Sequence, residues 1–461
     1  MADEILTFQE VFNDAREPHR IIAVSESKVV EYQTLRKDVY ILYSKITQNY
    51  RPHVYINIQS PGYFLVAVLA CAFAHRDIYN VSTLSQESIE ELVESDDLFF
   101  TDIDDFSVSK CMVINIHELV GEHYDSVGDF AMPTIDSENV THYLLVEAPN
   151  HTIIRNPLSI HSMEKLIHAM LKTFPDIEPS TVFCYTDKLS FGFYLIFGAL
   201  LSFLKRGIIY LPRIKTQNSL INLLTHPYVL ITSYDFIKTI NTETTIPRAT
   251  FVAFLGRVIN QQTILHASQI FHSQLVQYIG TARSFCYAYR SPIKSNLIHL
   301  LDGIEYKLDK NNVLVLTKNI VREEEYNTNL IVKPKHNGFE LVGDAQRLIF
   351  VDGQKFFLDE VEKYALGMEQ IKNAAALAIK DDKRNAKDAC VCLAIELEDN
   401  YKNSFNENRE RTNFIIGIRS DLETVLPSQL VPRKVRLIEK MPYNKNGMIN
   451  YDNLVENFVT A

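Results

Sequence analysis

Strand-like and helix-like runs alternate through roughly the first three hundred residues of this chain. A short β-rich run, His53 to Ile58, is broken by Pro61-Gly62 and followed by an apolar helical run from Tyr63 to Ala74. Short apolar or alternating runs indicate strands, whereas longer runs with helical spacing indicate helices. Strands separated by helices pair in parallel, because the helix returns the chain to the same edge of the sheet. The alternation therefore predicts an α/β fold whose parallel sheets are covered by helices.

Further runs continue this pattern and then change character. We expect strands at Ile78 to Val81, Leu98 to Asp102, Cys111 to Ile116, Tyr143 to Val146, Val182 to Tyr185, Gly207 to Leu211, Val229 to Thr232 and Thr250 to Leu255. We expect helices at Ser85 to Ser95, Ser159 to Phe174 and Ser190 to Leu204. After Ile293 the chain becomes a β-rich subdomain of hairpins, with turns expected at Asp302-Gly303, Asn311-Asn312 and Asn337-Gly338.

A compact pattern of α+β type begins near Gly343. Its expected elements are a helix at Phe357 to Ala365, strands at Ala374 to Ile379 and Ala389 to Leu397, and a helix at Asp421 to Val425. The polar stretch from Glu398 to Arg411 is expected to be a surface loop with at most a solvated helix. These features predict a large N-terminal domain, residues 1–343, and a small C-terminal domain, residues 344–461.

Composition narrows the class of protein. The hydrophobic fraction of 46% and the charged fraction of 22% are ordinary for a globular protein with a core. A net charge of -11 without a long basic run argues against nucleic-acid binding. The longest apolar run, Phe191 to Phe203, is too short to span a bilayer. The start of the chain carries no signal-peptide pattern, and the six cysteines lack metal-ligand spacing, so we expect reduced thiols, no metal site and a cytoplasmic location.

Three segments resemble motifs of the adenylate-forming (ANL) superfamily, which comprises acyl-CoA synthetases, acyl-AMP ligases and the adenylation domains of peptide synthetases. Ile279 to Arg290 is similar to Y-G-S-T-E-T-G-x-x-A-x-R, and Gly343 to Glu362 is similar to the family hinge, G-R-x-D followed by K-x-x-G-x-R-(V/I)-x-L-x-E-(V/I)-E. Leu430 to Ile449 resembles the ending V-P…L-P-x4-G-K. Their order and spacing imply the adenylate-forming fold over nearly the whole chain, with the small C-terminal domain as a lid.

The resemblance implies a nucleotide site, and the chain departs from the family at the loop that wraps the β,γ-phosphates. Glu147 to Pro157 contains no glycine, two prolines remove backbone donors, and Glu147 adds negative charge. Thr152 and Arg155 are the candidate phosphate contacts, unless they are plain loop residues. Transfer of an adenylyl group builds negative charge on phosphate oxygens, so a site without backbone donors and cations is poorly suited to it.

Four further nucleotide positions also differ. Gly280 matches the family and Thr281 stands at its serine, but Ala282 and Arg283 stand where it has Thr-Glu and the glutamate helps to hold magnesium. The ribose-binding aspartate is matched by Asn329, which accepts hydrogen bonds without charge assistance. Asp344 and Gln346 stand where the hinge has Arg and Asp. Met448 replaces the catalytic lysine, for which Lys445 is a candidate substitute. Arg283 either binds an anion directly or forms a structural salt bridge.

The residues implied for the acyl channel and for a partner surface each have two interpretations, and Leu255 replaces a family glycine and would narrow the channel. Phe193, Tyr194, Leu255 and Gly256 fall where the family lines its channel, although each is also typical of core packing. Basic residues gather in the small domain, either as a contact surface or as a solvated face: Lys380, Lys383, Arg384, Arg433, Lys434, Arg436, Lys440 and Lys445. The family docks acidic carrier proteins or CoA near its lid, so an acyl carrier protein or partner enzyme is the expected partner.

These departures lead to one main hypothesis and two alternatives. The chain is expected to be a pseudoenzyme that keeps the fold, lacks ATP-dependent adenylation and needs no cofactor. It would bind an acyl or aryl carboxylate, a carrier protein or a partner enzyme in a lipid, aryl polyene or polyketide-like pathway, an association that comes from the family. The alternatives are an active acyl-AMP or acyl-CoA ligase with a rebuilt site for ATP and magnesium, and a scaffold subunit without a small-molecule site.

Overall fold

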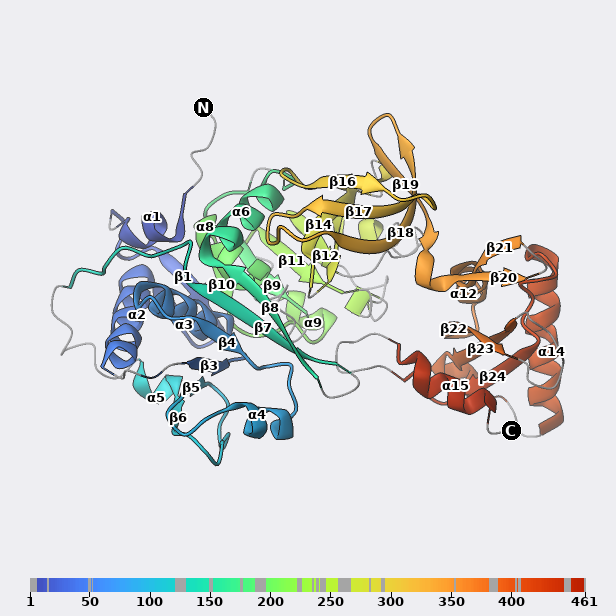
Figure 1. Cartoon of the computed structure of the whole chain (residues 1–461), viewed down its shortest axis with the longest axis horizontal. Coiled ribbons are helices and arrows are strands. Elements are labelled where there is room, and N and C mark those ends of the chain that lie inside the picture. The colour runs from blue at the N-terminus through green and yellow to red at the C-terminus, as the bar shows by residue number, and fades with distance from the viewer. Residues whose placement is uncertain are drawn as a thin grey trace. The chain divides into compact units, whose positions relative to one another are not determined.

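The chain forms two compact units in the computed structural model (Figure 1). The structure describes residues 6–14, 16–48, 51, 53–120, 130–148, 152–174, 177–186, 196–221, 226–233, 236–237, 240, 246–255, 267–281, 283–291, 295–351, 354–380, 389–402, 404, 408–442 and 449–459. The first unit comprises Met1–Tyr306, Leu316–Tyr326 and His336–Phe339, and the second comprises Lys307–Val315, Asn327–Lys335 and Glu340–Ala461. The boundary expected at residues 343 and 344 stays a prediction.

One sheet of the first unit has six strands in the order β6-β5-β3-β4-β7-β8. Four pairings, β6-β5, β5-β3, β3-β4 and β4-β7, are parallel, and β7-β8 is an antiparallel hairpin. The strands are β3 (Val54–Asn57), β4 (Ile78–Asn80), β5 (Leu98–Thr101), β6 (Val113–Asn115), β7 (Thr141–Glu147) and β8 (Ile153–Ser159). The helices between them are α3 (Pro61–Phe73), α4 (Gln86–Leu92) and α5 (Ile116–Leu119). The parallel part follows the alternation expected from the sequence.

A second sheet of thirteen strands has the order β16-β17-β18-β19-β15-β14-β13-β12-β11-β9-β10-β1-β2. Its strands are β1 (Ile21–Val24), β2 (Val29–Glu31), β9 (Val182–Tyr185), β10 (Ile208–Tyr210), β11 (Tyr228–Thr232), β12 (Phe251–Leu255), β13 (Gln274–Thr281), β14 (Phe285–Ser291), β15 (Ser295–Leu300), β16 (Glu305–Leu308), β17 (Val313–Lys318), β18 (Tyr326–Lys335) and β19 (Gly338–Asp344). Pairing is parallel from β1 through β10, β9, β11 and β12 to β13, and antiparallel from β13 to β15.

The core of the first unit is built mainly from apolar helices packed on these strands. Helices α1 (Phe8–Asn13), α2 (Tyr32–Thr47), α6 (Ile160–Leu171) and α8 (Ser202–Leu204), with the π-helix η2 (Ile196–Leu201), contribute to one cluster. Every residue of α3 from Phe64 to Phe73 is buried, as expected for a helix that is apolar on all sides. Among the described residues, no helix is long and apolar enough to cross a membrane.

His142 on β7 is buried, and neither of its ring nitrogens has a hydrogen-bond partner. Burial lowers its pKa to about 4, because the apolar surroundings disfavour the imidazolium. The folded-state pKa lies below that of the unfolded chain, so the unfolded protein binds the proton more tightly. Stability from this residue is therefore complete above about pH 6.5 and is lost as the pH falls toward 4.

We expect the His142→Leu substitution to remove this pH dependence. At pH 5 His142 lowers the free energy of unfolding by about 2 kcal/mol relative to pH 7, from the two pKa values. Urea denaturation of both proteins at pH 7 and pH 5, followed by circular dichroism, measures the difference. Other groups, including Glu164, titrate in both proteins, so their effect on the free energy of unfolding cancels when the two proteins are compared. Equal losses of stability in both proteins would contradict the prediction.

The second unit contains a three-stranded sheet in the order β22-β23-β24 and a β20-β21 hairpin. Its elements after β19 are η3 (Ala345–Arg347), β20 (Leu348–Val351), β21 (Gln354–Phe357), α12 (Leu358–Leu366), β22 (Ile371–Lys380), β23 (Ala389–Leu397), α13 (Asp399–Lys402), α14 (Asn408–Val425), β24 (Lys434–Ile438) and α15 (Tyr451–Val459). The predicted α/β architecture, with a large N-terminal and a small C-terminal part, is confirmed.

Two expected features are wrong in detail. The segment after β7, interpreted as a phosphate loop, becomes strand β8 from Ile153 onward, because its backbone pairs along the whole length of β7. The helix expected at Asp421 to Val425 begins earlier, since α14 starts at Asn408 and so includes the end of the polar stretch Glu398 to Arg411. Only Ile418 and Leu422 of α14 are buried, so the apolar signal in the sequence is weak.

Candidate functional site

The β7-β8 hairpin carries the first group of predicted site residues. Ala148 N donates to Thr152 O at 2.9 Å and closes the hairpin, whereas residues 149–151 lie outside the described chain. Thr152 and Arg155 are exposed, and the Arg155 guanidinium lies 5.9 Å from the centre of the Tyr79 ring. Glu147 accepts a 3.0 Å bond from Ser85 N, next to helix α4. Arg155 and Glu147 therefore both have structural contacts near the turn of this hairpin.

The turn between β13 and β14 carries the second group. Thr281 and Ser284 are linked reciprocally: each backbone N donates to the hydroxyl of the other residue at 3.1 Å. The Thr281 hydroxyl also lies 3.0 Å from the Tyr326 hydroxyl. Gly280 lies in the paired part of β13, Ala282 is outside the described residues, and the Arg283 side chain is exposed. Phe285, at the start of β14, has a φ of 51°, a conformation that costs energy for an aromatic residue.

Three residues that the sequence did not single out border this turn: Asn156, Asn319 and Arg322. Arg322 Nη2 donates to Asn156 Oδ1 at 3.1 Å, and Asn319 Nδ2 donates to Ser284 O at 2.8 Å. Arg322 Nε and Asn319 Oδ1 are buried without a partner. Burial lowers the pKa of Arg322, and the positive charge of Arg283 lowers it further. The charge of Arg283 thus acts on a second guanidinium, that of Arg322. Arg322 begins a charged stretch that runs to Glu325 and is typical of a solvated loop.

Asn329, Asp344 and Gln346, three of the remaining nucleotide positions, lie in the second unit. Asn329 has a φ of 60°, and its backbone N donates to Asn327 Oδ1 at 2.8 Å. Asp344 caps η3 by accepting a 2.8 Å bond from Gln346 N, and the Gln346 side chain is exposed. The carboxylate of Asp344 therefore supports the local backbone at the position where the resemblance implies a hinge arginine.

Gly343 precedes these hinge residues and is required by packing. The Phe357 ring lies against it so closely that a Cβ at this position would collide with the ring. The absence of a side chain allows this close approach. The chain thus keeps the glycine of the hinge motif for a reason that is independent of nucleotide binding.

The base of the closing loop is well defined. Met441 is buried, and its backbone N donates to Glu396 Oε2 at 2.9 Å. Asn450 N donates to Pro442 O at 2.8 Å and joins the two ends of the loop. Residues 443–448 lie outside the described chain, so the positions of Lys445 and Met448 stay predictions.

The predicted acyl channel lies largely outside the described residues. Phe193, Tyr194 and Gly256 belong to undescribed segments. Leu255 ends β12 and pairs in register with Tyr278, but its side chain is not described. The channel therefore stays a prediction.

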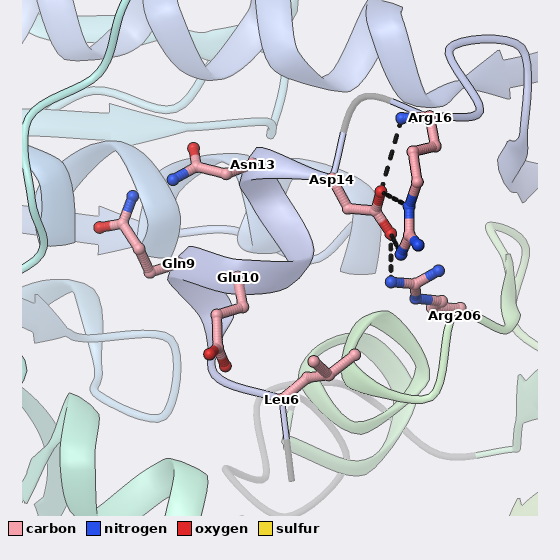
Figure 2. A pocket seen from close by; sticks show the side chains of 7 residues that line it. All are labelled: Leu6, Gln9, Glu10, Asn13, Asp14, Arg16 and Arg206. Atoms are coloured by element: carbon pink, nitrogen blue, oxygen red, sulfur yellow. Dashed lines mark hydrogen bonds and ion pairs between the residues drawn. The ribbon is translucent and has the colours of Figure 1, made fainter. Parts of the chain in front are cut away.

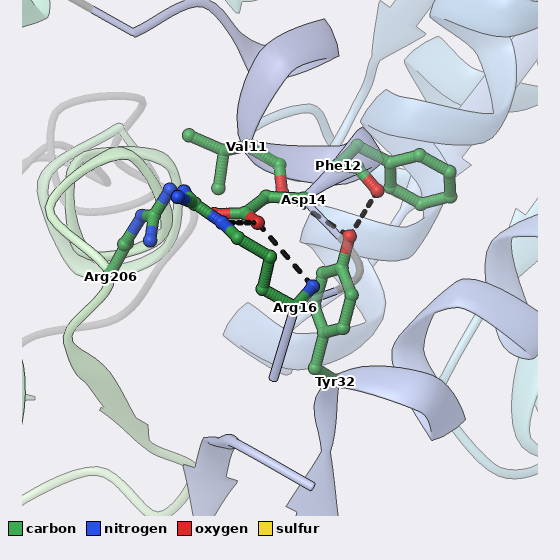
Figure 3. Close-up of polar contacts among 6 residues, drawn as sticks. All are labelled: Val11, Phe12, Asp14, Arg16, Tyr32 and Arg206. Carbon is green, nitrogen blue, oxygen red and sulfur yellow. Dashed lines mark hydrogen bonds and ion pairs between the residues drawn. The ribbon is translucent and has the colours of Figure 1, made fainter. Parts of the chain in front are cut away.

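A hollow of about 660 Å³ lies beside helix α1 (Figure 2). Its lining residues are Leu6, Gln9, Glu10, Asn13, Asp14, Arg16 and Arg206. Asp14 accepts bonds from Arg16 Nε at 2.6 Å and from Arg206, and Glu10 forms a capping box with Thr7. The hydroxyl of Tyr32, on α2, donates to the backbone oxygen of Phe12 on α1 (Figure 3). Because the charged groups are bonded to one another, we interpret this hollow as the anchorage of α1 and not as a ligand site.

The basic residues of the second unit are only partly described. Arg433, Lys434 and Lys440 are exposed, whereas the Arg436 guanidinium lies 5.7 Å from the centre of the Phe458 ring. Lys383, Arg384 and Lys445 lie outside the described chain, and the Lys380 side chain is not described.

The β13-β14 turn fits a magnesium ion poorly. A divalent cation needs carboxylate or carbonyl oxygens, whereas the turn presents Arg283 with Arg322 nearby. Within the described parts of the chain, no three His, Cys, Asp or Glu side chains form a group that could hold a metal ion.

The fold is that of the adenylate-forming enzymes. The ATP-bound MatB of Rhodopseudomonas palustris is similar at 12% identity, with 97% of each chain covered and a TM-score of 0.79. The o-succinylbenzoate CoA synthetase (MenE) of Bacillus subtilis, solved with the acyl-adenylate OSB-AMP, is similar at 14% identity, with 95% of each chain covered and a TM-score of 0.75. A benzoate CoA ligase of Burkholderia xenovorans is 12% identical over 96% of this chain and 98% of that chain, with a TM-score of 0.75.

At these identities the likeness concerns the fold alone. No protein-family model and no curated protein sequence matches the chain.

Proposed function

We propose that this chain keeps the adenylate-forming fold but lacks ATP-dependent adenylation. The observation that carries the proposal is the guanidinium of Arg283 at the β13-β14 turn, with Arg322 from the segment between β17 and β18 nearby. Arg283 stands where the resemblance implies a metal-holding glutamate, and its charge acts on the partly buried Arg322. A positive charge in place of that glutamate repels a divalent cation, and adenylation depends on the cation to neutralise developing phosphate charge.

Other positions support the same proposal. Asn329 is uncharged where an aspartate would bind ribose, and Asp344 bonds its own local backbone where a hinge arginine is implied. Met448 stands in the sequence where the catalytic lysine is implied. The base of the closing loop is held by the bond from Met441 N to Glu396 Oε2, and the proposed loss of chemistry concerns the residue at its tip, not this base.

The ligand is proposed to be a small acyl or aryl carboxylate, and the partner an acyl carrier protein or a partner enzyme of an acyl-chain pathway. Solved structures with this fold include complexes with acyl-adenylates, such as OSB-AMP and anthranoyl-AMP. The exposed Arg433, Lys434 and Lys440 provide positive charge for an acidic partner.

Calorimetry with ATP, in the presence and absence of Mg²⁺, tests the loss of the metal site. We expect Mg²⁺ not to strengthen ATP binding, because Arg283 and Arg322 disfavour the ion. A tenfold or greater increase in affinity on adding Mg²⁺, about 1.4 kcal/mol, would support an active ligase with a rebuilt site instead. Thermal-shift measurements with benzoate and short fatty acids separate a carboxylate-binding protein from a scaffold, because a ligand that binds the native state raises its stability.

A further inference from the structure

Three segments of the first unit meet around the β13-β14 turn. Asn156 comes from β8, Ser284 from the turn, and Asn319 and Arg322 from the segment between β17 and β18. Asn156 is held by its own bond to Leu144 O at 3.2 Å and accepts from Arg322 Nη2 at 3.1 Å. Asn319 is 5% exposed and donates to Ser284 O at 2.8 Å. These bonds form one framework, which joins β8 to the Arg322 segment and that segment to the turn that carries Arg283.

This framework leaves polar groups unsatisfied. Arg322 Nε and Asn319 Oδ1 are buried without hydrogen-bond partners, although buried polar groups are normally paired. The carboxylate of Glu324 and the Tyr326 hydroxyl partly favour the charge on Arg322, while the positive charge of Arg283 opposes it and contributes to the lowered pKa. The buried Arg322 Nε is therefore a donor without a partner beside the turn, and an anion would satisfy it.

The chemistry of these groups selects the anion. A guanidinium presents its N–H donors in a planar fork that matches the oxygens of a carboxylate or phosphate. The Thr281 hydroxyl is bonded to Ser284 and to the Tyr326 hydroxyl, so these groups brace the turn that carries Arg283. The left-handed Phe285 stores backbone strain at the same turn, as is common at binding sites.

We propose that Arg283 and Arg322 bind an oxyanion, a carboxylate or a phosphate group, directly and without a metal ion. The proposal rests on the proposed function, because it gives the altered turn a ligand in place of metal-bound ATP. It involves no covalent step.

Calorimetry in EDTA with benzoate, AMP and inorganic phosphate as probes tests the proposal. We expect at least one probe to bind, with affinity at least about tenfold lower in Arg283→Gln and in Arg322→Gln. Arg419→Gln, which removes an exposed arginine on α14, is the matched control and should leave the affinity unchanged. Binding of AMP and phosphate identifies a phosphate ligand, and binding of benzoate alone identifies a carboxylate.

The absence of binding by all three probes, a requirement for Mg²⁺, or unchanged affinity in both arginine variants would overturn the proposal. Arg283 is exposed, so Arg283→Gln should fold even if Arg322→Gln does not, and it keeps the test decisive. Failure of this proposal is distinguishable from failure of the proposed loss of adenylation, because the latter is judged by Mg²⁺-dependent ATP binding and exchange and not by oxyanion affinity.

Discussion

Substitution of Arg347 by methionine is expected to lower the free energy of unfolding of the second unit by about 3–5 kcal/mol. Arg347 is buried and donates to Glu362, to Asp359 Oδ1 at 2.8 Å and to Ala376 O at 3.1 Å. Its guanidinium also lies 4.7 Å from the centre of the Tyr451 ring. Burial opposes the charge, but Glu362 and Asp359 raise the pKa of Arg347, so the arginine stays charged. Its loss leaves Glu362 buried without a counter-charge.

Hydrogen exchange of the β22 amides in the full chain measures this effect, because these amides report opening of the second unit. The double variant Arg347→Met with Glu362→Leu removes both charges and should recover most of the loss. Arg419→Met, which breaks an exposed pair with Glu423, should change the opening free energy by less than about 0.5 kcal/mol. A loss below about 1 kcal/mol in Arg347→Met, or no recovery in the double variant, would contradict the role assigned to this arginine.

Local patterns in the sequence predict the architecture but not every element. Strands β9 and β11 are fully buried short apolar runs, so they are readable from the local sequence alone. Strand β8 escapes prediction because Ile153, Arg155 and Pro157 do not alternate clearly with their neighbours, and only pairing with β7 makes the segment a strand. Its structure depends on a partner strand, which a local pattern does not contain.

The candidate site is predictable only where a motif marks it. The similarity of Ile279 to Arg290 to a family stretch singles out Arg283. Asn156 and Arg322 are separated by 166 residues, and nothing in the sequence near either one indicates their contact. Long-range polar contacts of this kind follow from the tertiary fold, which is why the sequence does not reveal Arg322 and Asn319.

ATP–pyrophosphate exchange is expected to be at least about 10⁴-fold slower than in a working ligase of this fold. Loss of a single group that stabilises transition-state charge typically costs about 10²–10³ in rate, and several such positions differ here. The losses are not additive, because the groups act as a unit. For the same reason Arg283→Glu or Met448→Lys alone should not raise exchange above background.

The most direct measurement is therefore ATP–pyrophosphate exchange by the unmodified protein across a panel of aryl and acyl carboxylates with Mg²⁺. The benzoate CoA ligase of Burkholderia xenovorans serves as the positive control in the same assay. We predict exchange at the no-enzyme background with every carboxylate. Carboxylate-dependent exchange within about 10²-fold of the control would contradict the loss of adenylation and identify an active ligase.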